Sequence, residues 1–166
     1  MRERVLVLAL IVTMFSPWSV GAATAQVVTG EEHCVVNVRA SDALNVRTKG
    51  SSNSKVETTL RYGTCGVVVT GACQGPWCPV EDGHHAGWVN SKYISMVSPA
   101  RYCVTGVGPG DKLNLRAFPS TTSRIVTALS RNQCEISFLP YAVGGWQKVR
   151  ASGYEGWAKR KYLSGE

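Results

Sequence analysis

Short runs of alternating apolar and polar residues follow one another along most of the chain after residue 25. The run Leu-Asn-Val-Arg at 44–47 places two aliphatic side chains on one face and two polar ones on the other, which predicts a half-buried strand. The runs at 77–81 and 87–89 flank a polar turn that contains Gly83, a pattern typical of a β-hairpin. No stretch after residue 25 sustains an apolar period of 3.6. The pattern therefore predicts an all-β protein made of small antiparallel barrels.

The whole pattern occurs twice, at a single offset of 69 positions. The residues that recur at this offset are Trp77 and Trp146, Val80 and Val149, Gly87 and Gly156, Trp88 and Trp157, Lys92 and Lys161, Tyr93 and Tyr162 and, upstream, Cys34 and Cys103, and Cys65 and Cys134. The chain is thus a duplicated unit, and we expect two domains, at 26–98 and 99–166. A short linker at 95–101, which contains Pro99, leaves little freedom between them. Units of roughly 65 residues have marginal cores unless they are stapled covalently.

Residues 1–25 have the features of a cleaved signal peptide. Arg2 and Arg4 give a basic start, residues 5–15 form an apolar run, and Ala-Thr-Ala at 23–25 offers the small residues that signal peptidases require. The apolar run is too short for a membrane span, which needs about 20 such residues. We therefore expect an exported mature chain, periplasmic or extracellular, with no membrane span of its own.

All six cysteines lie after residue 25. In an oxidising compartment, an even number of cysteines in small units predicts disulfides. The duplication selects among the possible pairings, because Cys103 and Cys134 are the only cysteines of the second unit. The predicted bridges are Cys34–Cys65, Cys73–Cys78 and Cys103–Cys134. A zinc site formed by Cys73, Cys78, His84 and His85 is the alternative, but the oxidising compartment disfavours it, and we expect neither a metal nor a cofactor.

Charge divides unequally between the two units. Residues 26–98 carry six Lys or Arg against six Asp or Glu, whereas residues 99–166 carry ten against four, a net charge of +6. An acidic polymer or peptide is therefore the favoured partner of the second unit, and nucleic acid is a poor candidate for an exported protein. Cysteines committed to disulfides leave no thiol nucleophile, and no Ser-His-Asp spacing or carboxylate pair stands out, so we expect no enzymatic activity.

The ordered series of motifs resembles the bacterial SH3 domain, often called SH3b. The series comprises Leu-Asn-Val-Arg, a Ser-rich loop, Val-x-x-x-Leu, Gly-Thr, a strand, Gly-Pro-Trp-x-x-Val, Gly-Trp-Val and Tyr-Ile, and it covers residues 34–95 and again 103–164. The resemblance implies two tandem SH3-like barrels. It also implies a non-catalytic module of an exported protein that binds peptidoglycan peptides or protein segments.

The resemblance further implies where a ligand binds. In the wider SH3 family a groove is lined by a Trp after the loop before the third long strand and by a Tyr just before the last strand. Trp77 and Tyr93 match these positions in the first unit, and Trp146 and Tyr162 match them in the second. The basic residues that we expect beside the second groove are Lys148, Arg150, Lys159, Arg160 and Lys161. Because Lys92 and Lys161 replace the Asn that helps to hold polyproline, polyproline specificity is not expected.

Other recurring residues have a structural interpretation. We expect Trp88 and Trp157, each of which follows a strand-opening Gly, to fill the two cores. The polar residues that recur on the outward face of the Leu-Asn-Val-Arg strands are Asn45, Arg47, Asn114 and Arg116. An outward Arg beside a loop more often donates a structural hydrogen bond than contacts a ligand.

Two classes of function remain open. The chain is either a binding module that presents two aromatic grooves to cell-wall peptides or to a protein, or a structural component that docks on another envelope protein. The sequence identifies neither the ligand nor which unit binds it.

Overall fold

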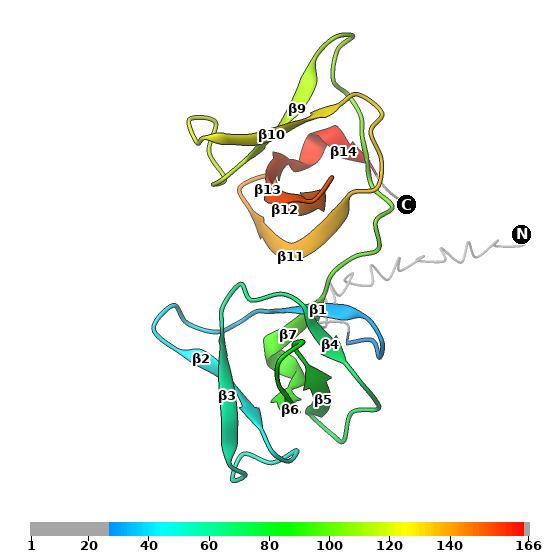
Figure 1. Ribbon diagram of the computed structural model, residues 1–166. Helices are drawn as coiled ribbons and strands as arrows, with labels where there is room; N and C mark the ends of the chain where they lie inside the picture. Colours follow the sequence, from blue (N-terminus) through cyan, green and yellow to red (C-terminus); the bar gives the residue numbers. More distant parts are fainter. Residues whose placement is uncertain (1–26, 165–166) are drawn as a thin grey trace, which may run out of the picture.

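The chain folds into antiparallel strands and two short 3-10 turns over residues 27–164, which are the residues that this computed structural model describes (Figure 1). The predicted signal peptide at 1–25 lies outside the described residues. The first unit contains β1 (Glu32–Val35), β2 (Ala43–Arg47), β3 (Val56–Arg61), β4 (Val67–Val69), β5 (Trp77–Glu81), β6 (Ala86–Asn90), η1 (Ser91–Tyr93) and β7 (Ile94–Met96). The second unit contains β8 (Cys103–Val104), β9 (Lys112–Arg116), β10 (Ile125–Ser130), β11 (Ser137–Val143), β12 (Trp146–Ala151), β13 (Tyr154–Lys159), η2 (Arg160–Tyr162) and β14 (Leu163–Ser164). The all-β prediction is confirmed.

The strands follow the same order in both units, except that the pair equivalent to β1 and β7 forms a separate sheet in the second unit. The first unit forms one sheet in the order β3-β2-β6-β5-β4-β1-β7, and the second forms a sheet in the order β10-β9-β13-β12-β11 beside the pair β14-β8. Leu44 lies opposite Leu60 in the first unit, and Leu113 lies opposite Leu129 at the same offset of 69 in the second. The duplication seen in the sequence is therefore also a duplication of strand register.

The recurring glycine before each second tryptophan has a steric cause. A Cβ on Gly87 would lie 2.7 Å from the backbone oxygen of Arg47, and a Cβ on Gly156 would lie 2.8 Å from that of Arg116. No larger residue fits at these two positions without moving a strand. Glycine therefore permits β6 and β13 to cross close to β2 and β9.

Each unit has a separate apolar core. The first consists of buried residues between 35 and 94 and the second of buried residues between 104 and 163. Alternation along β2 places Leu44 and Val46 in the first core, as the sequence pattern predicts. Trp88 and Trp157 are only partly buried and lie outside the cores of the two units, so the expectation that they fill these cores is wrong. Their strands instead place Val89 and Ala158, the next residues along, in the two cores. Trp157 packs against the apolar cluster that contains Leu139 and Tyr141.

Three disulfides staple the chain, as predicted. Cys34 is bonded to Cys65 and Cys103 to Cys134, each across a sequence separation of 31. The third bridge joins Cys73 to Cys78 across a separation of five. Among the described residues no cysteine is free, which excludes thiolate ligands for the alternative zinc site.

The two units are in direct contact through a third apolar cluster. Cys34 and Val97 from the first unit pack with Leu139 and Tyr141 from β11 of the second, and all four side chains are buried. The hydroxyl of Tyr141 donates a hydrogen bond of 2.8 Å to the backbone oxygen of Val35. Separate cores and a buried contact between them describe two small domains docked on one another.

Candidate functional site

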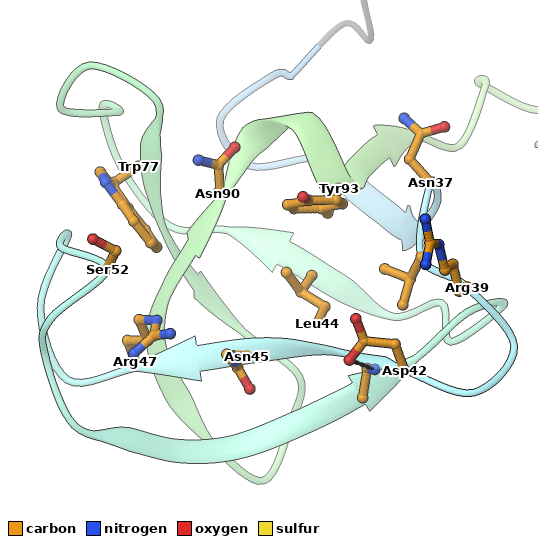
Figure 2. A pocket seen from close by; sticks show the side chains of 12 residues that line it. Asn37, Arg39, Asp42, Leu44, Asn45, Arg47, Ser52, Trp77, Asn90 and Tyr93 are labelled. Atoms are coloured by element: carbon orange, nitrogen blue, oxygen red, sulfur yellow. Dashed lines mark hydrogen bonds between the residues drawn. The ribbon is translucent and has the colours of Figure 1, made fainter.

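A groove opens on the first unit between a loop, β2 and the turn that ends β6. Its volume is about 420 Å³. Trp77 and Tyr93 contribute partly buried rings, and Asn90 lies between them (Figure 2). Asp42, Asn45, Arg47 and Ser52 lie across from these rings, and Asn37 and Arg39 lie at one end (Figure 2).

Local sequence explains how the aromatic residues are held. Trp77 opens β5 and pairs with Asn90 across the β5–β6 hairpin. The Oδ1 atom of Asn90 accepts a hydrogen bond of 3.1 Å from the backbone N–H of Lys92, which caps η1. Tyr93 is the last residue of η1, so this capped turn sets the position of its ring.

A second groove, of about 150 Å³, lies at the equivalent place on the second unit. The residue pairs that line both grooves at the offset of 69 are Val38 and Val107, Asp42 and Asp111, Ala43 and Lys112, Leu44 and Leu113, Asn45 and Asn114, Arg47 and Arg116, Ser52 and Thr121, Trp77 and Trp146, Asn90 and Lys159, and Tyr93 and Tyr162. The structure thus brings both predicted aromatic pairs together, each pair within one groove. Whether either groove binds a ligand remains a prediction.

The smaller second groove has a lysine over its tryptophan. The Lys159 ammonium lies 4.3 Å from the centre of the Trp146 ring, and Trp146 is only 7% exposed. At the other wall, the Lys161 ammonium lies 4.7 Å from the centre of the Tyr162 ring. Both predicted lysines of the turn therefore lie against the groove aromatics.

Of the five predicted basic residues, four do not line the second groove, and Lys159 is the one that does. Lys148 and Arg150 share the outward face of β12 with Trp146, but they are engaged by Glu155 at 3.5 and 2.8 Å. The guanidinium of Arg160 lies over the Phe138 ring at 4.7 Å and donates to the backbone oxygen of Leu163. The expectation that the whole basic set surrounds the groove is wrong, because ion pairs and aromatic packing within the protein hold Lys148, Arg150 and Arg160 elsewhere.

The recurring polar residues of β2 and β9 line the grooves as well as supporting the loops beside them. Arg47 donates a hydrogen bond of 2.7 Å to the backbone oxygen of Ser54, and Arg116 donates one of 2.6 Å to that of Ser123. The structural interpretation of these arginines is therefore correct but incomplete. Asp42 and Asp111, which the sequence analysis did not select, also face the grooves. Recurrence at the offset of 69 was the signal that could have identified them.

The described residues present little catalytic or metal-binding chemistry. The Glu32 carboxylate and the sulfur atoms of Cys34 and Cys65 lie within 4.8 Å of one another, but the two sulfurs are bonded to each other. His33 is fully buried, and burial lowers the pKa of its imidazole. His85 lies in an exposed hairpin turn, 3.4 Å from the Asp82 carboxylate. None of these groups faces either groove.

The comparisons with known proteins agree with the resemblance. Residues 111–164 match the family model of the bacterial SH3 domain. The second unit is therefore similar to the bacterial SH3 domain over these residues. No curated protein matches the sequence.

Two solved structures are similar to the chain at low identity. One is the structure of NlpC2 from Trichomonas vaginalis, at 18% identity and a TM-score of 0.38, over 83% of this chain and 49% of that one. The other is NlpC1 from Trichomonas vaginalis, at 20% identity and a TM-score of 0.38, over 92% and 51%. The chain thus spans about half the length of each.

Proposed function

We propose that the chain is an exported, non-enzymatic binding protein that holds cell-wall peptides in its aromatic grooves, with the first groove as the principal site. The observation that carries the proposal is the joint lining of one groove by Trp77 and Tyr93, both of which keep part of their rings exposed. A groove of about 420 Å³ has the size of a site for a short peptide or small molecule.

The polar residues of the first groove suit a peptide that carries charges of both signs. Arg39 and Arg47 offer guanidinium groups, and Asp42 offers a carboxylate on the same groove. Peptidoglycan stem peptides carry free carboxylates and amino groups on a short backbone. Aromatic rings supply apolar contact area at a low cost in conformational entropy, and the charged groups orient the ligand.

The disulfides support a role in an oxidising compartment. Six cysteines form three disulfides, which persist in exported proteins and are rare in reducing compartments. Within residues 27–164 no helix is long and apolar enough to cross a membrane. Neither groove is lined by a histidine or a cysteine, so nucleophilic catalysis of the Cys–His type has no support there.

Cosedimentation with purified peptidoglycan sacculi tests the proposal. We expect the tandem chain to sediment with sacculi, and Trp77→Ala and Tyr93→Ala each to reduce the bound fraction strongly. Tyr154→Ser is a matched control, because Tyr154 is a 50% exposed aromatic residue that lines neither groove. Binding that is unchanged in both groove variants contradicts the assignment of the site.

A second candidate is a structural component that docks on another envelope protein. The observation that favours it is the exposure of three apolar side chains on the second unit, Phe118 at 70%, Val143 at 53% and Ile125 at 46%. In that case sacculi do not retain the chain, and Phe118→Ser abolishes its capture by an envelope extract while Trp77→Ala does not.

A further inference from the structure

The two grooves differ in charge although they share one architecture. At equivalent positions the first groove has Asn37, Arg39, Ala43 and Asn90, where the second unit has Gly106, Gly108, Lys112 and Lys159. The charged residues that line the first groove are Arg39, Arg47 and Asp42, and those that line the second are Lys112, Arg116, Lys159 and Asp111. The second groove therefore has the larger positive charge and lacks the polar rim at 37 and 39.

The most consequential difference is the exchange of Asn90 for Lys159. In the first groove, Asn90 uses its side-chain oxygen to cap η1 and leaves the ring of Trp77 partly exposed. In the second groove, the Lys159 ammonium covers the ring of Trp146. η2 begins at Arg160 without any side-chain cap, so the turn forms with a lysine at this position.

We propose that the second groove selects ligands that carry a carboxylate more strongly than the first groove does. This inference rests on the proposed function, because it assumes that the grooves bind peptides. It assigns different ligand chemistry to two sites that a duplication made similar.

The physical reason is the state of Lys159 before the ligand binds. A neutral apolar ligand must displace the ammonium from the Trp146 ring and loses the cation–π contact without replacing it. A carboxylate gains an ion pair with Lys159, and Lys112 and Arg116 add attraction of the same sign. No cation at position 90 imposes this penalty in the first groove, because Asn90 carries no charge.

Two short peptides distinguish these cases. The probes are acetyl-Ala-Ala with a free carboxylate and acetyl-Ala-Ala-amide, which differ by one charge. The indole N–H signals of Trp77 and Trp146 in the NMR spectrum of the full tandem chain, after removal of residues 1–25, report on the two grooves separately.

We expect the Trp146 indole signal to respond at lower concentrations of the carboxylate probe than of the amide probe. The carboxylate probe binds the second groove about fivefold more tightly than the amide, as a difference of ~1 kcal/mol in favour of the ion pair implies. The two probes differ less in affinity for the first groove, which has the smaller positive charge. Added salt reduces the preference at Trp146, because exposed charges are screened over about 8–10 Å.

A reciprocal exchange of the repeat's own residues completes the test. Lys159→Asn reduces the preference for the carboxylate probe at Trp146, and Asn90→Lys increases it at Trp77. Equal binding of both probes at Trp146 overturns the inference and leaves the proposed function standing, provided that Trp77 responds. A lack of response at both Trp77 and Trp146 contradicts the proposed function itself, and the inference falls with it.

Discussion

Arg150 of the second unit forms a two-point ion pair with Glu32 of the first. Its two terminal nitrogens donate to the two carboxylate oxygens at 2.7 and 2.9 Å, across a sequence separation of 118. Glu32 also accepts a hydrogen bond from the backbone N–H of Gly66, and Arg150 also donates to Glu155. Together with the buried cluster around Tyr141, this pair joins two separately cored domains.

Removing the carboxylate tests the contribution of this pair. We expect Glu32→Gln to lower the free energy of unfolding by ~1–2 kcal/mol, measured by urea denaturation. Hydrogen bonds between charged groups stabilise a protein less when they are partly exposed to solvent, so a value at the lower end of their usual stabilisation is expected. The control is Glu57→Gln, which breaks the exposed Lys55–Glu57 pair and is expected to change little.

The same pair has a defined pH dependence. The hydrogen bond from Arg150 lowers the pKa of Glu32 below its ordinary value of 4.5. The folded state therefore favours the ionised carboxylate. The contribution of the ion pair to the free energy of unfolding is present above pH 4.5 and is lost as the pH falls through the lowered pKa. Glu32→Gln lacks this part of the acid destabilisation. An identical acid profile in both proteins counts against the ion pair in solution.

Tyr141 tests whether the domains dock in solution. Tyr141→Phe is expected to destabilise the tandem chain by ~1 kcal/mol, since it removes the hydrogen bond to the backbone oxygen of Val35. We predict that the fragment 99–166 folds cooperatively while Cys103 and Cys134 stay oxidised, and that the same substitution does not destabilise it because Val35 is absent. Equal destabilisation in the fragment and in the tandem chain contradicts the docked arrangement.

Burial of His33 is expected to make the stability of the protein depend on pH in a higher range than Glu32 does. Its Nε2 accepts a hydrogen bond from the backbone N–H of Val28 and its Nδ1 lies 2.8 Å from the backbone oxygen of Glu31, an arrangement that fits the neutral ring. Burial lowers the pKa of His33 from 6.5. Just below pH 6.5, His33 is therefore protonated in the unfolded chain but remains neutral in the folded chain.

The expected result is a fall in the free energy of unfolding as the pH drops below 6.5, by up to about 1.4 kcal/mol per unit of pH. His33→Gln removes this slope between pH 6.5 and 5, whereas a double substitution of the exposed His84 and His85 by Gln keeps it. If the double variant rather than His33→Gln flattens the profile, the assignment to His33 is wrong.

The disulfides are expected to contribute unequally. Replacing Cys103 and Cys134 by Ser opens a loop with a sequence separation of 31, whereas replacing Cys73 and Cys78 opens one with a separation of five. On the chain-entropy account the first change costs about 3–4 kcal/mol and the second about 2. Thermal unfolding of the two double variants shows which disulfide contributes more stability. A larger loss of stability on replacing Cys73 and Cys78 contradicts the expectation.

The sequence predicted the repeat, the strands and the disulfides because these features are local or recur at one offset. Alternation at 44–47 was enough to assign the buried face of β2. It was not enough for Trp88 and Trp157, because each follows a glycine whose own role is to permit close strand crossing, and the alternation places the next residue inside.

The groove composition was harder to predict because it depends on contacts between distant residues. Arg150 lies near Trp146 in the sequence, but Glu32 engages its side chain from the other domain. Arg160 lies between two groove lysines, but its guanidinium packs on Phe138. Net charge alone therefore overstated the basic patch, and only Lys159 and Lys161 of the predicted set lie against groove aromatics.

Binding of peptide in the first groove is tested by a chemical-shift map of the isotope-labelled tandem chain during titration with a soluble stem peptide released from peptidoglycan. We predict that the largest chemical-shift changes occur at Trp77, Tyr93 and the β2 residues Asn45 and Arg47, and that these changes saturate together. Changes confined to residues outside both grooves, or none at millimolar peptide, would contradict it.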